Sequence, residues 1–146
     1  LVYFKITKFL SSFIRPLQLH LRIPRQYEEK HIVSDDMRLK QILCNLLDNA
    51  LKFTHIGQIT FGYRKIKKGW LEFFIEDTGI GISKEHRQII FDRFRQSDEK
   101  ISCMYIGNGL CLAICKGYLN AMGAEISVQS QLGKESKFIF TFPYKK

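Results

Sequence analysis

The chain has 146 residues, 45% of them hydrophobic, with twelve Phe, six Tyr and a formal net charge of +9 at pH 7. A chain of this length and composition can bury a hydrophobic core as one domain, which excludes a disordered polypeptide. No apolar run approaches the roughly 20 residues needed to cross a bilayer. The positive charge predicts a surface that attracts anions, and the candidates are nucleic acid, nucleotide phosphates and an acidic protein domain.

The distribution of basic residues and cysteines narrows these candidates. Lys and Arg are scattered along the chain with no dense basic block, which disfavours nucleic acid as a partner. The four cysteines, Cys44, Cys103, Cys111 and Cys115, include no Cys-x-x-Cys pair. They indicate reduced, cytosolic thiols and disfavour a metal site built from cysteine.

The beginning of the chain predicts a helix followed by a strand. Residues 1–15 have the apolar spacing of an amphipathic helix that ends at Pro16. Over residues 17–23, Leu and Ile alternate with Gln, His and Arg, which predicts a half-buried strand. A charged turn then leads to a short strand over residues 31–33, a candidate hairpin partner.

Residues 39–54 predict the central helix of the domain. Apolar residues recur at the three- and four-residue spacing of a helix face that packs in a core: Leu39, Ile42, Leu43, Leu46, Leu47 and Ala50. Beside them Asn45, Asn49 and Lys52 stand at i, i+4 and i+7, on one line of the helix surface. These three either face water or form a polar floor that binds a hard cation and phosphate oxygens.

The rest of the chain predicts two pairs of strands and two helices. Strands are expected over residues 57–64 and 70–77, then helices over residues 84–90 and 110–122, and last strands over residues 125–130 and 136–142. Because the strands come in hairpins with helices between them, the expected fold is a two-layer α/β sandwich. Its sheet would be mixed and largely antiparallel, with three helices on one face.

Two glycine motifs carry possible binding chemistry. Asp77 ends a strand and can accept a hydrogen bond from an exocyclic amine, while Gly79 and Gly81 let the backbone approach a flat ring. Gly107 and Gly109 open a helix, whose exposed N–H groups can hold phosphate. Each motif alone is also typical of an ordinary turn. No Gly-x-x-x-x-Gly-Lys-Ser/Thr motif is present, which excludes a P-loop protein.

Taken together and in order, the motifs resemble the ATP-binding catalytic domain of bacterial sensor histidine kinases, a branch of the GHKL superfamily. The family's N, G1, F, G2 and G3 boxes resemble residues 45–54, 77–82, 91–94, 107–114 and 133–138. The resemblance covers residues 17–143 and implies the GHKL sandwich. It further implies a catalytic domain over residues 17–146, and a helical connection from a missing dimerisation domain over residues 1–16.

The resemblance also implies roles for individual residues. Asn45 and Lys52 would act in catalysis, Asn49 would coordinate Mg²⁺, and Asp77 would bind the adenine amine of ATP. The remaining cofactor-binding residues would be Gly79, Gly81, Phe91, Phe94, Gly107, Gly109 and Leu110, with residues 91–105 forming the ATP lid.

Asn45 bears on the type of reaction. In gyrase-like and mismatch-repair relatives the corresponding position holds a glutamate that activates water, whereas an amide cannot accept a proton from water. The resemblance therefore implies transfer of the γ-phosphoryl group of Mg-ATP to a histidine on a separate dimerisation domain, and not hydrolysis. The downstream partner would be a response-regulator receiver domain. The fragment would belong to the cytoplasmic part of a membrane-bound sensor, without membrane contact of its own.

Several positions depart from the family pattern. Ile106, Cys111 and Glu135 stand where the family usually has glycine. None of the four histidines starts a His-Glu/Asp motif on a long helix: His20, His31, His55 and His86. The fragment would therefore lack a phosphate acceptor and be inactive in phosphotransfer on its own. Two alternatives remain, a degenerate, nucleotide-poor domain that acts as a protein-interaction module and a basic nucleic-acid binder.

Overall fold

The computed structural model describes residues 17–24, 35–92 and 111–144. Its elements are β1 (Leu17–Arg22), α2 (Asp36–Phe53), β2 (Gly57–Lys67), β3 (Trp70–Asp77), α3 (Lys84–Ile89), α5 (Cys111–Ala121), β4 (Ile126–Gln131) and β5 (Glu135–Pro143). These elements follow the order expected from the sequence. The helix expected over residues 1–15 and the strand expected over residues 31–33 lie outside the described residues.

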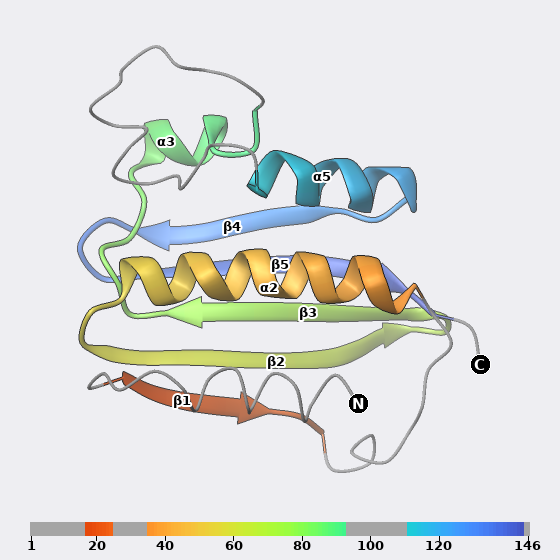
Figure 1. The fold of residues 1–146 in the computed structure, drawn as a ribbon, viewed down its shortest axis with the longest axis horizontal. Coiled ribbons are helices and arrows are strands. Elements are labelled where there is room, and N and C mark those ends of the chain that lie inside the picture. Colours follow the sequence, from red (N-terminus) through yellow and green to blue (C-terminus); the bar gives the residue numbers. More distant parts are fainter. Residues whose placement is uncertain (1–16, 25–34, 93–110, 145–146) are drawn as a thin grey trace.

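The strands form one sheet in the order β1-β2-β3-β5-β4, and α2 and α5 lie together over one face of it (Figure 1). β1 and β2 are parallel, while β2 with β3, β3 with β5 and β4 with β5 are antiparallel. The parallel pair arises because α2 lies between β1 and β2 in the chain, and parallel strands need such a crossover connection. The predicted two-layer sandwich with a mixed, largely antiparallel sheet is therefore confirmed.

The first strand is less buried than the alternation of its residues predicts. Leu19 and Leu21 are 39% and 37% exposed, and only Leu17 packs against the core. Among the described strands β1 pairs with β2 alone, at the edge of the sheet, whereas α2 packs over β3. The helices of the described part of the chain therefore leave the apolar side chains of this edge strand partly exposed.

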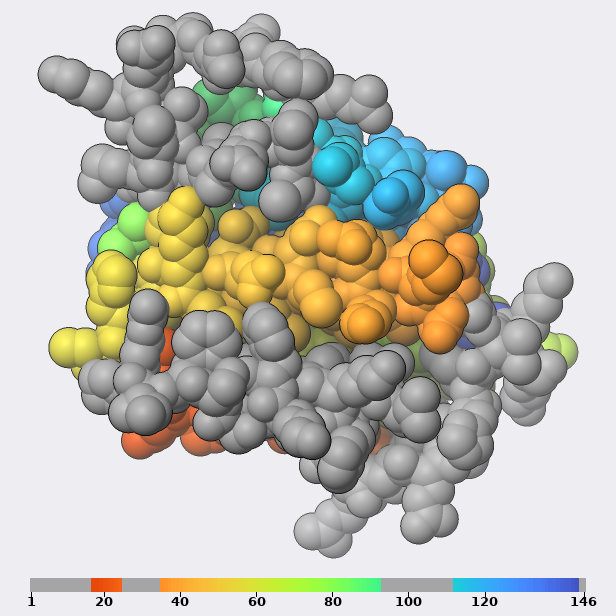
Figure 2. All heavy atoms as spheres, in the orientation of Figure 1, coloured from red at the N-terminus to blue at the C-terminus, as the bar shows by residue number. Residues whose placement is uncertain are grey.

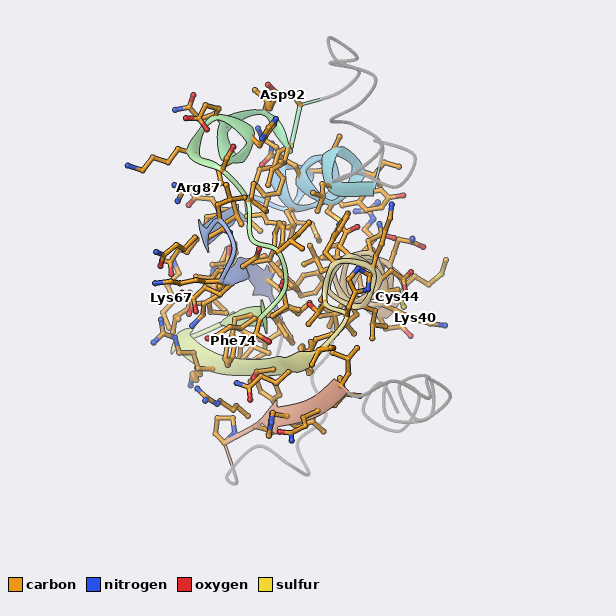
Figure 3. The ribbon with its side chains drawn as sticks, turned by 90° about the vertical axis from the view of Figure 1, so that its left-hand side faces the viewer. Lys40, Cys44, Lys67, Phe74, Arg87 and Asp92 are labelled. Carbon is orange, nitrogen blue, oxygen red and sulfur yellow. The ribbon has the colours of Figure 1, made fainter. Side chains whose placement is uncertain are left out.

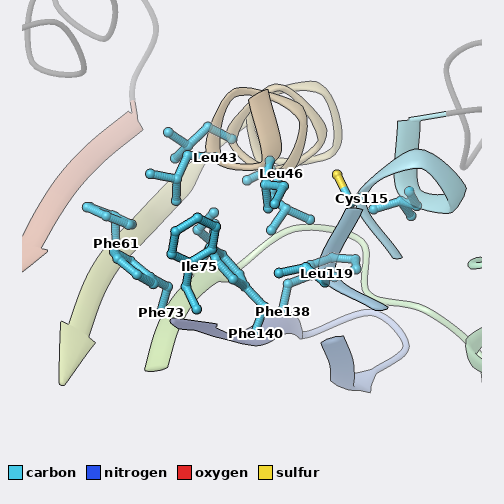
Figure 4. Close-up of a cluster of buried hydrophobic side chains, with 14 of the residues drawn as sticks. Leu43, Leu46, Phe61, Phe73, Ile75, Cys115, Leu119, Phe138 and Phe140 are labelled. Carbon is cyan, nitrogen blue, oxygen red and sulfur yellow. The ribbon is translucent and has the colours of Figure 1, made fainter. Parts of the chain in front are cut away.

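The core lies between α2, α5 and the inner face of the sheet (Figure 4). All six apolar positions of the predicted α2 stripe are buried, and Ile42 and Leu46 are fully enclosed. Beneath them the rings of Phe73 and Phe140 stack with their centroids 5.1 Å apart. Each fully buried side chain of this kind contributes about 1.5–3 kcal/mol, so the stripe is what holds α2 on the sheet.

α5 packs beside α2 and ends as the sequence predicts. Its Cys115 and Leu119 are fully buried and point toward α2 and the sheet (Figure 4). At its end Gly123 has φ +67°, and the Ala124 N–H donates to the Leu119 carbonyl over 2.9 Å. This arrangement satisfies carbonyls that would otherwise be left without partners at the helix end. The outer surfaces of α2 and α5 adjoin in the space-filling view (Figure 2).

The opposite face of the sheet carries charged side chains with long alkyl stems. Lys137 Nζ lies 3.4 Å from a carboxylate oxygen of Glu76 and 4.9 Å from the centroid of the Phe74 ring. Figure 3 shows Phe74 and Lys67 on the side of the molecule away from Lys40 and Cys44 of α2. Among the described residues, no helix is long and apolar enough to span a membrane.

Candidate functional site

A pocket opens where β3 ends, between the last turn of α2, the loop after β3, α3 and the start of α5. It holds about 410 Å³ of space between atoms when the open solvent at its mouth is included. Its walls contain Asn49, Asp77 and Gly81, three residues singled out in the sequence. The remaining lining residues are Phe53, Ile80, Ile82, Ile90, Leu112, Ser136 and Phe138.

Asp77 is the polar centre of this pocket and is only 4% exposed. Its Oδ1 accepts hydrogen bonds from the Gly79 N–H over 2.9 Å and from the Thr54 hydroxyl over 3.3 Å. Because both bonds from described residues go to Oδ1, the second carboxylate oxygen is left to accept a hydrogen bond from a ligand.

Burial raises the pKa of Asp77 to about 6, and the nearby carboxylates of Glu135 and Glu76 act in the same direction. The hydrogen bonds from Gly79 and Thr54 favour the charged form and only partly offset the loss of water around the carboxylate. The carboxylate is thus ionised at pH 7 but becomes protonated in mildly acidic solution.

This pKa predicts a pH-dependent stability. The ordinary pKa of Asp is about 3.9, so between about pH 4 and 6 the folded chain binds this proton more tightly than the unfolded chain. The stabilising contribution is therefore present below pH 4 and is lost as the pH rises to 6, by up to about 3 kcal/mol. In urea unfolding, Asp77→Asn should gain stability relative to the wild type between pH 4.5 and pH 7. Identical dependence of stability on pH in the two proteins would refute a raised pKa at Asp77.

Neighbouring backbone atoms leave no room for a side chain at either of the two glycines after Asp77. A Cβ atom at Gly79 would lie 2.4 Å from the Phe53 carbonyl oxygen, and one at Gly81 would lie 2.1 Å from the Gln131 carbonyl oxygen. Gly81 also has φ +67°, a conformation that favours glycine. The glycines thus let the loop pack directly against the end of α2 and against the β4–β5 turn.

Hydrogen bonds fasten the same loop at both sides. The Ile80 N–H donates to the Phe53 carbonyl over 3.2 Å, and the Gly133 N–H donates to the Ile80 carbonyl over 2.7 Å. The pocket wall is therefore tied both to α2 and to the β4–β5 turn.

Of the three residues in the predicted polar stripe of α2, the structure brings one, Asn49, to the wall of this pocket. Asn49 lines it, while Lys52 is exposed, with Nζ 5.2 Å from the centroid of the Phe53 ring. Asn45 lies one turn earlier, where its Nδ2 donates to Cys115 Sγ over 3.5 Å and its Oδ1 accepts from Gln41 Nε2 over 3.0 Å. The contact with Cys115 links α2 to α5 and was not predicted from the sequence.

Other residues implied by the resemblance lie at the margin of the described structure. Phe91 is partly buried, and its ring meets that of Phe138, a pocket residue, edge to face at 6.3 Å. Phe94, Gly107, Gly109 and Leu110 lie outside the described residues, as does the expected lid beyond residue 92. The side chain of Cys111, one of the positions where the family has glycine, is likewise not described.

The described residues contain no group of three or more His, Cys, Asp and Glu side chains that could hold a metal ion. Mg²⁺ in nucleotide sites is usually held by one or two protein oxygens together with phosphate oxygens and water. The amide oxygen of Asn49, at the wall of the pocket, fits such a site.

The structure adds polar residues that sequence reasoning missed. Thr54 is fully buried beneath Asp77, and Ser136, 5% exposed, lies directly opposite Asp77 on β5. The position of Ser136 depends on the β3–β5 register and that of Thr54 on how the end of α2 meets β3, and the residue pattern alone reveals neither. Glu135, the other described position where the family has glycine, is exposed at the start of β5.

One pocket thus brings together a buried carboxylate at the end of a central strand, an amide side chain of α2 and the loop over residues 78–83, the glycine loop. The model of the histidine kinase-, DNA gyrase B- and HSP90-like ATPases matches residues 34–146. The chain belongs to this family.

Its curated relatives are sensor histidine kinases. The signal transduction histidine-protein kinase BarA of Escherichia coli is 39% identical over 134 residues, covering 89% of this chain and 14% of BarA. The autoinducer 2 sensor kinase/phosphatase LuxQ of Vibrio vulnificus is 36% identical over 150 residues, covering 94% of this chain and 17% of LuxQ. The chain therefore spans less than a fifth of the length of these relatives.

Solved structures agree with this assignment. Full-length ShkA in complex with AMPPNP superposes with a TM-score of 0.82 at 29% identity, covering 99% of this chain and 30% of ShkA. The catalytic domain of histidine kinase ThkA, in a nucleotide-free form, gives a TM-score of 0.75 at 23% identity, covering 97% and 87% of the two chains. At that identity ThkA supports the fold alone. The predicted family and its GHKL sandwich are confirmed.

Proposed function

We propose that this chain binds ATP with Mg²⁺ and donates the γ-phosphoryl group to a histidine on the dimerisation domain of a two-component sensor kinase. The observation that carries this proposal is the carboxylate of Asp77, which is buried in the pocket and whose bonds from described residues both go to one of its two oxygens. A receiver domain would then take the phosphoryl group, on the cytoplasmic side of the membrane.

Different residues of the chain would bind the adenine and the phosphate ends of ATP. Asp77 would accept a hydrogen bond from the adenine amine, since an ionised carboxylate is an acceptor only. Asn49 would coordinate Mg²⁺, which when bound neutralises phosphate charge, and Lys52 would approach the phosphates from the exposed rim. Phosphoryl transfer depends mainly on such positioning and charge neutralisation.

Asn45 favours transfer over hydrolysis within this proposal. Its carboxamide is held between Gln41 and Cys115, and an amide cannot take a proton from an attacking water. The histidine of the dimerisation domain would therefore be the nucleophile.

A second candidate is a protein-interaction module with the same fold but poor nucleotide binding. Glu135 favours it, because a carboxylate stands near Asp77 where the family usually has glycine and raises the pKa of Asp77. The two candidates predict different behaviour toward the dimerisation domain.

Phosphotransfer in trans separates these candidates. The chain is incubated with γ-labelled Mg-ATP and a separately produced histidine-bearing dimerisation domain. Label on the histidine, absent when that histidine is replaced, is expected for the kinase. Complex formation with the dimerisation domain, without nucleotide binding or label transfer, is expected for the interaction module and would overturn the first proposal.

Lys52→Ala is expected to weaken ATP binding about 3- to 10-fold at low salt, because it removes one exposed positive charge near the phosphates. Adenosine, which carries no phosphate, should bind both proteins equally. Lys40→Ala is the matched control, since Lys40 is also exposed on α2 but lies about 18 Å nearer the start of the helix. Equal losses for the two variants, or an equal loss for adenosine, would contradict a phosphate contact at Lys52.

A further inference from the structure

Ser130, on β4, lies at a junction of three chain segments behind the pocket. Its hydroxyl oxygen is 2.7 Å from the Ile82 amide nitrogen, 2.6 Å from the Glu135 carbonyl oxygen and 3.1 Å from Ser136 Oγ. Ile82 belongs to the glycine loop, while Glu135 and Ser136 open β5. One hydroxyl thus connects the loop, β4 and β5.

The protons in this junction can be assigned by elimination. A carbonyl oxygen cannot donate, so the single proton of Ser130 must go to the Glu135 carbonyl. The Ile82 N–H is a donor and occupies one lone pair of Ser130. The contact with Ser136 is therefore a hydrogen bond only if Ser136 donates its own proton to the remaining lone pair of Ser130.

This assignment fixes the chemical character of Ser136 within the pocket. Ser136 lines the pocket and is paired with Asp77 across the β3–β5 ladder. With its proton committed to Ser130, Ser136 Oγ offers only lone pairs to a ligand. The Asp77 carboxylate and the Ser136 hydroxyl are then two hydrogen-bond acceptors on adjacent strands. They suit a ligand edge that carries N–H donors, whereas a ligand carbonyl at the same place would find no donor.

We infer that Ser130 is a positioning residue of the nucleotide pocket, which holds the glycine loop through the Ile82 N–H and fixes Ser136 as a hydrogen-bond acceptor. The inference rests on the proposed function, because the ligand edge it concerns is that of the purine base. Without the Ser130 hydroxyl, Ser136 could rotate and donate its proton into the pocket, which would admit a carbonyl in place of an amino group.

The test compares ATP with inosine triphosphate, which carries a carbonyl where ATP carries the amino group. Ser130→Ala is expected to lower the ratio of the two affinities about tenfold relative to the wild type, as measured by calorimetry with Mg²⁺. Ser130→Thr keeps the hydroxyl and should restore the ratio. Ser127→Ala is the matched control, because Ser127 is exposed on the same strand.

A measurement without nucleotide tests whether Ser130 holds the glycine loop through the Ile82 N–H. Hydrogen exchange of the Ile82 amide should be faster in Ser130→Ala than in the wild type and in Ser127→Ala. An unchanged affinity ratio in Ser130→Ala, or an Ile82 amide as protected as in the wild type, would overturn the inference while leaving the proposed function intact. Failure of the wild type to bind ATP would instead overturn both.

Discussion

Asp77→Asn is expected to weaken Mg-ATP binding by on the order of 100-fold or more, because a buried site that loses its hydrogen-bond partner discriminates strongly. The amide oxygen of Asn can still accept the bonds from Gly79 and Thr54, so the loop should keep its shape. Its NH₂ group, however, would face the donor amine of adenine. Calorimetric titration of the variant measures the loss.

Stability and a neighbouring variant control for this experiment. Asp77→Asn should unfold at no lower urea concentration than the wild type at pH 7, because the buried charge has been removed. Glu76→Gln makes the same chemical change one residue earlier, where the carboxylate pairs with Lys137 on the outer face. It should bind ATP as the wild type does. Unchanged affinity in Asp77→Asn would show that adenine is bound elsewhere.

Gly81→Ala is expected to lower the free energy of unfolding by about 3 kcal/mol and to weaken ATP binding with it. The added Cβ would meet the Gln131 carbonyl oxygen and carbon at 2.1 and 2.8 Å, and backbone atoms there cannot rotate away. A residue with Cβ also loses about 1–2 kcal/mol in a left-handed conformation. The loop would therefore separate from the β4–β5 turn.

Gly133→Ala separates the steric effect from the conformational one. Gly133 has φ +77°, but a Cβ added there would meet no atom within 4 Å, so only the conformational cost of about 1–2 kcal/mol applies. Urea unfolding of both variants gives the comparison. Equal destabilisation would contradict a direct backbone contact at Gly81.

The sequence predicted the parts of the fold that depend on local spacing. The 3.6-residue period of the α2 stripe identified six of the seven buried residues of this helix, all but Leu51, and Gly123 correctly marked the end of α5. Alternation predicted strands well but not their burial: Leu19 and Leu21 alternate as core residues do, yet β1 lies at the sheet edge. Strand order is a property of the whole sheet that alternation within one strand does not contain.

Among the residues singled out in the sequence, Asn49, Asp77 and Gly81 line the pocket of the structure. Gly79 and Gly81 were selected for approach to a ligand, and the structure adds that protein backbone occupies the space beside them. Ser130 and Ser136 showed no signal, because isolated serines in a strand are common and their meaning comes from the registers of β3–β5 and β4–β5. Cys115 likewise gained its contact with Asn45 only through the packing of α5 on α2.

Calorimetric titration of the folded wild-type chain with ATP in the presence of Mg²⁺ tests the central claim most directly. Saturable binding with one site per chain is expected, and adenosine should compete for it because Asp77 recognises the base. Absence of saturable heat at millimolar ATP, from a chain that still unfolds cooperatively in urea, would contradict ATP binding and leave the interaction module as the better account.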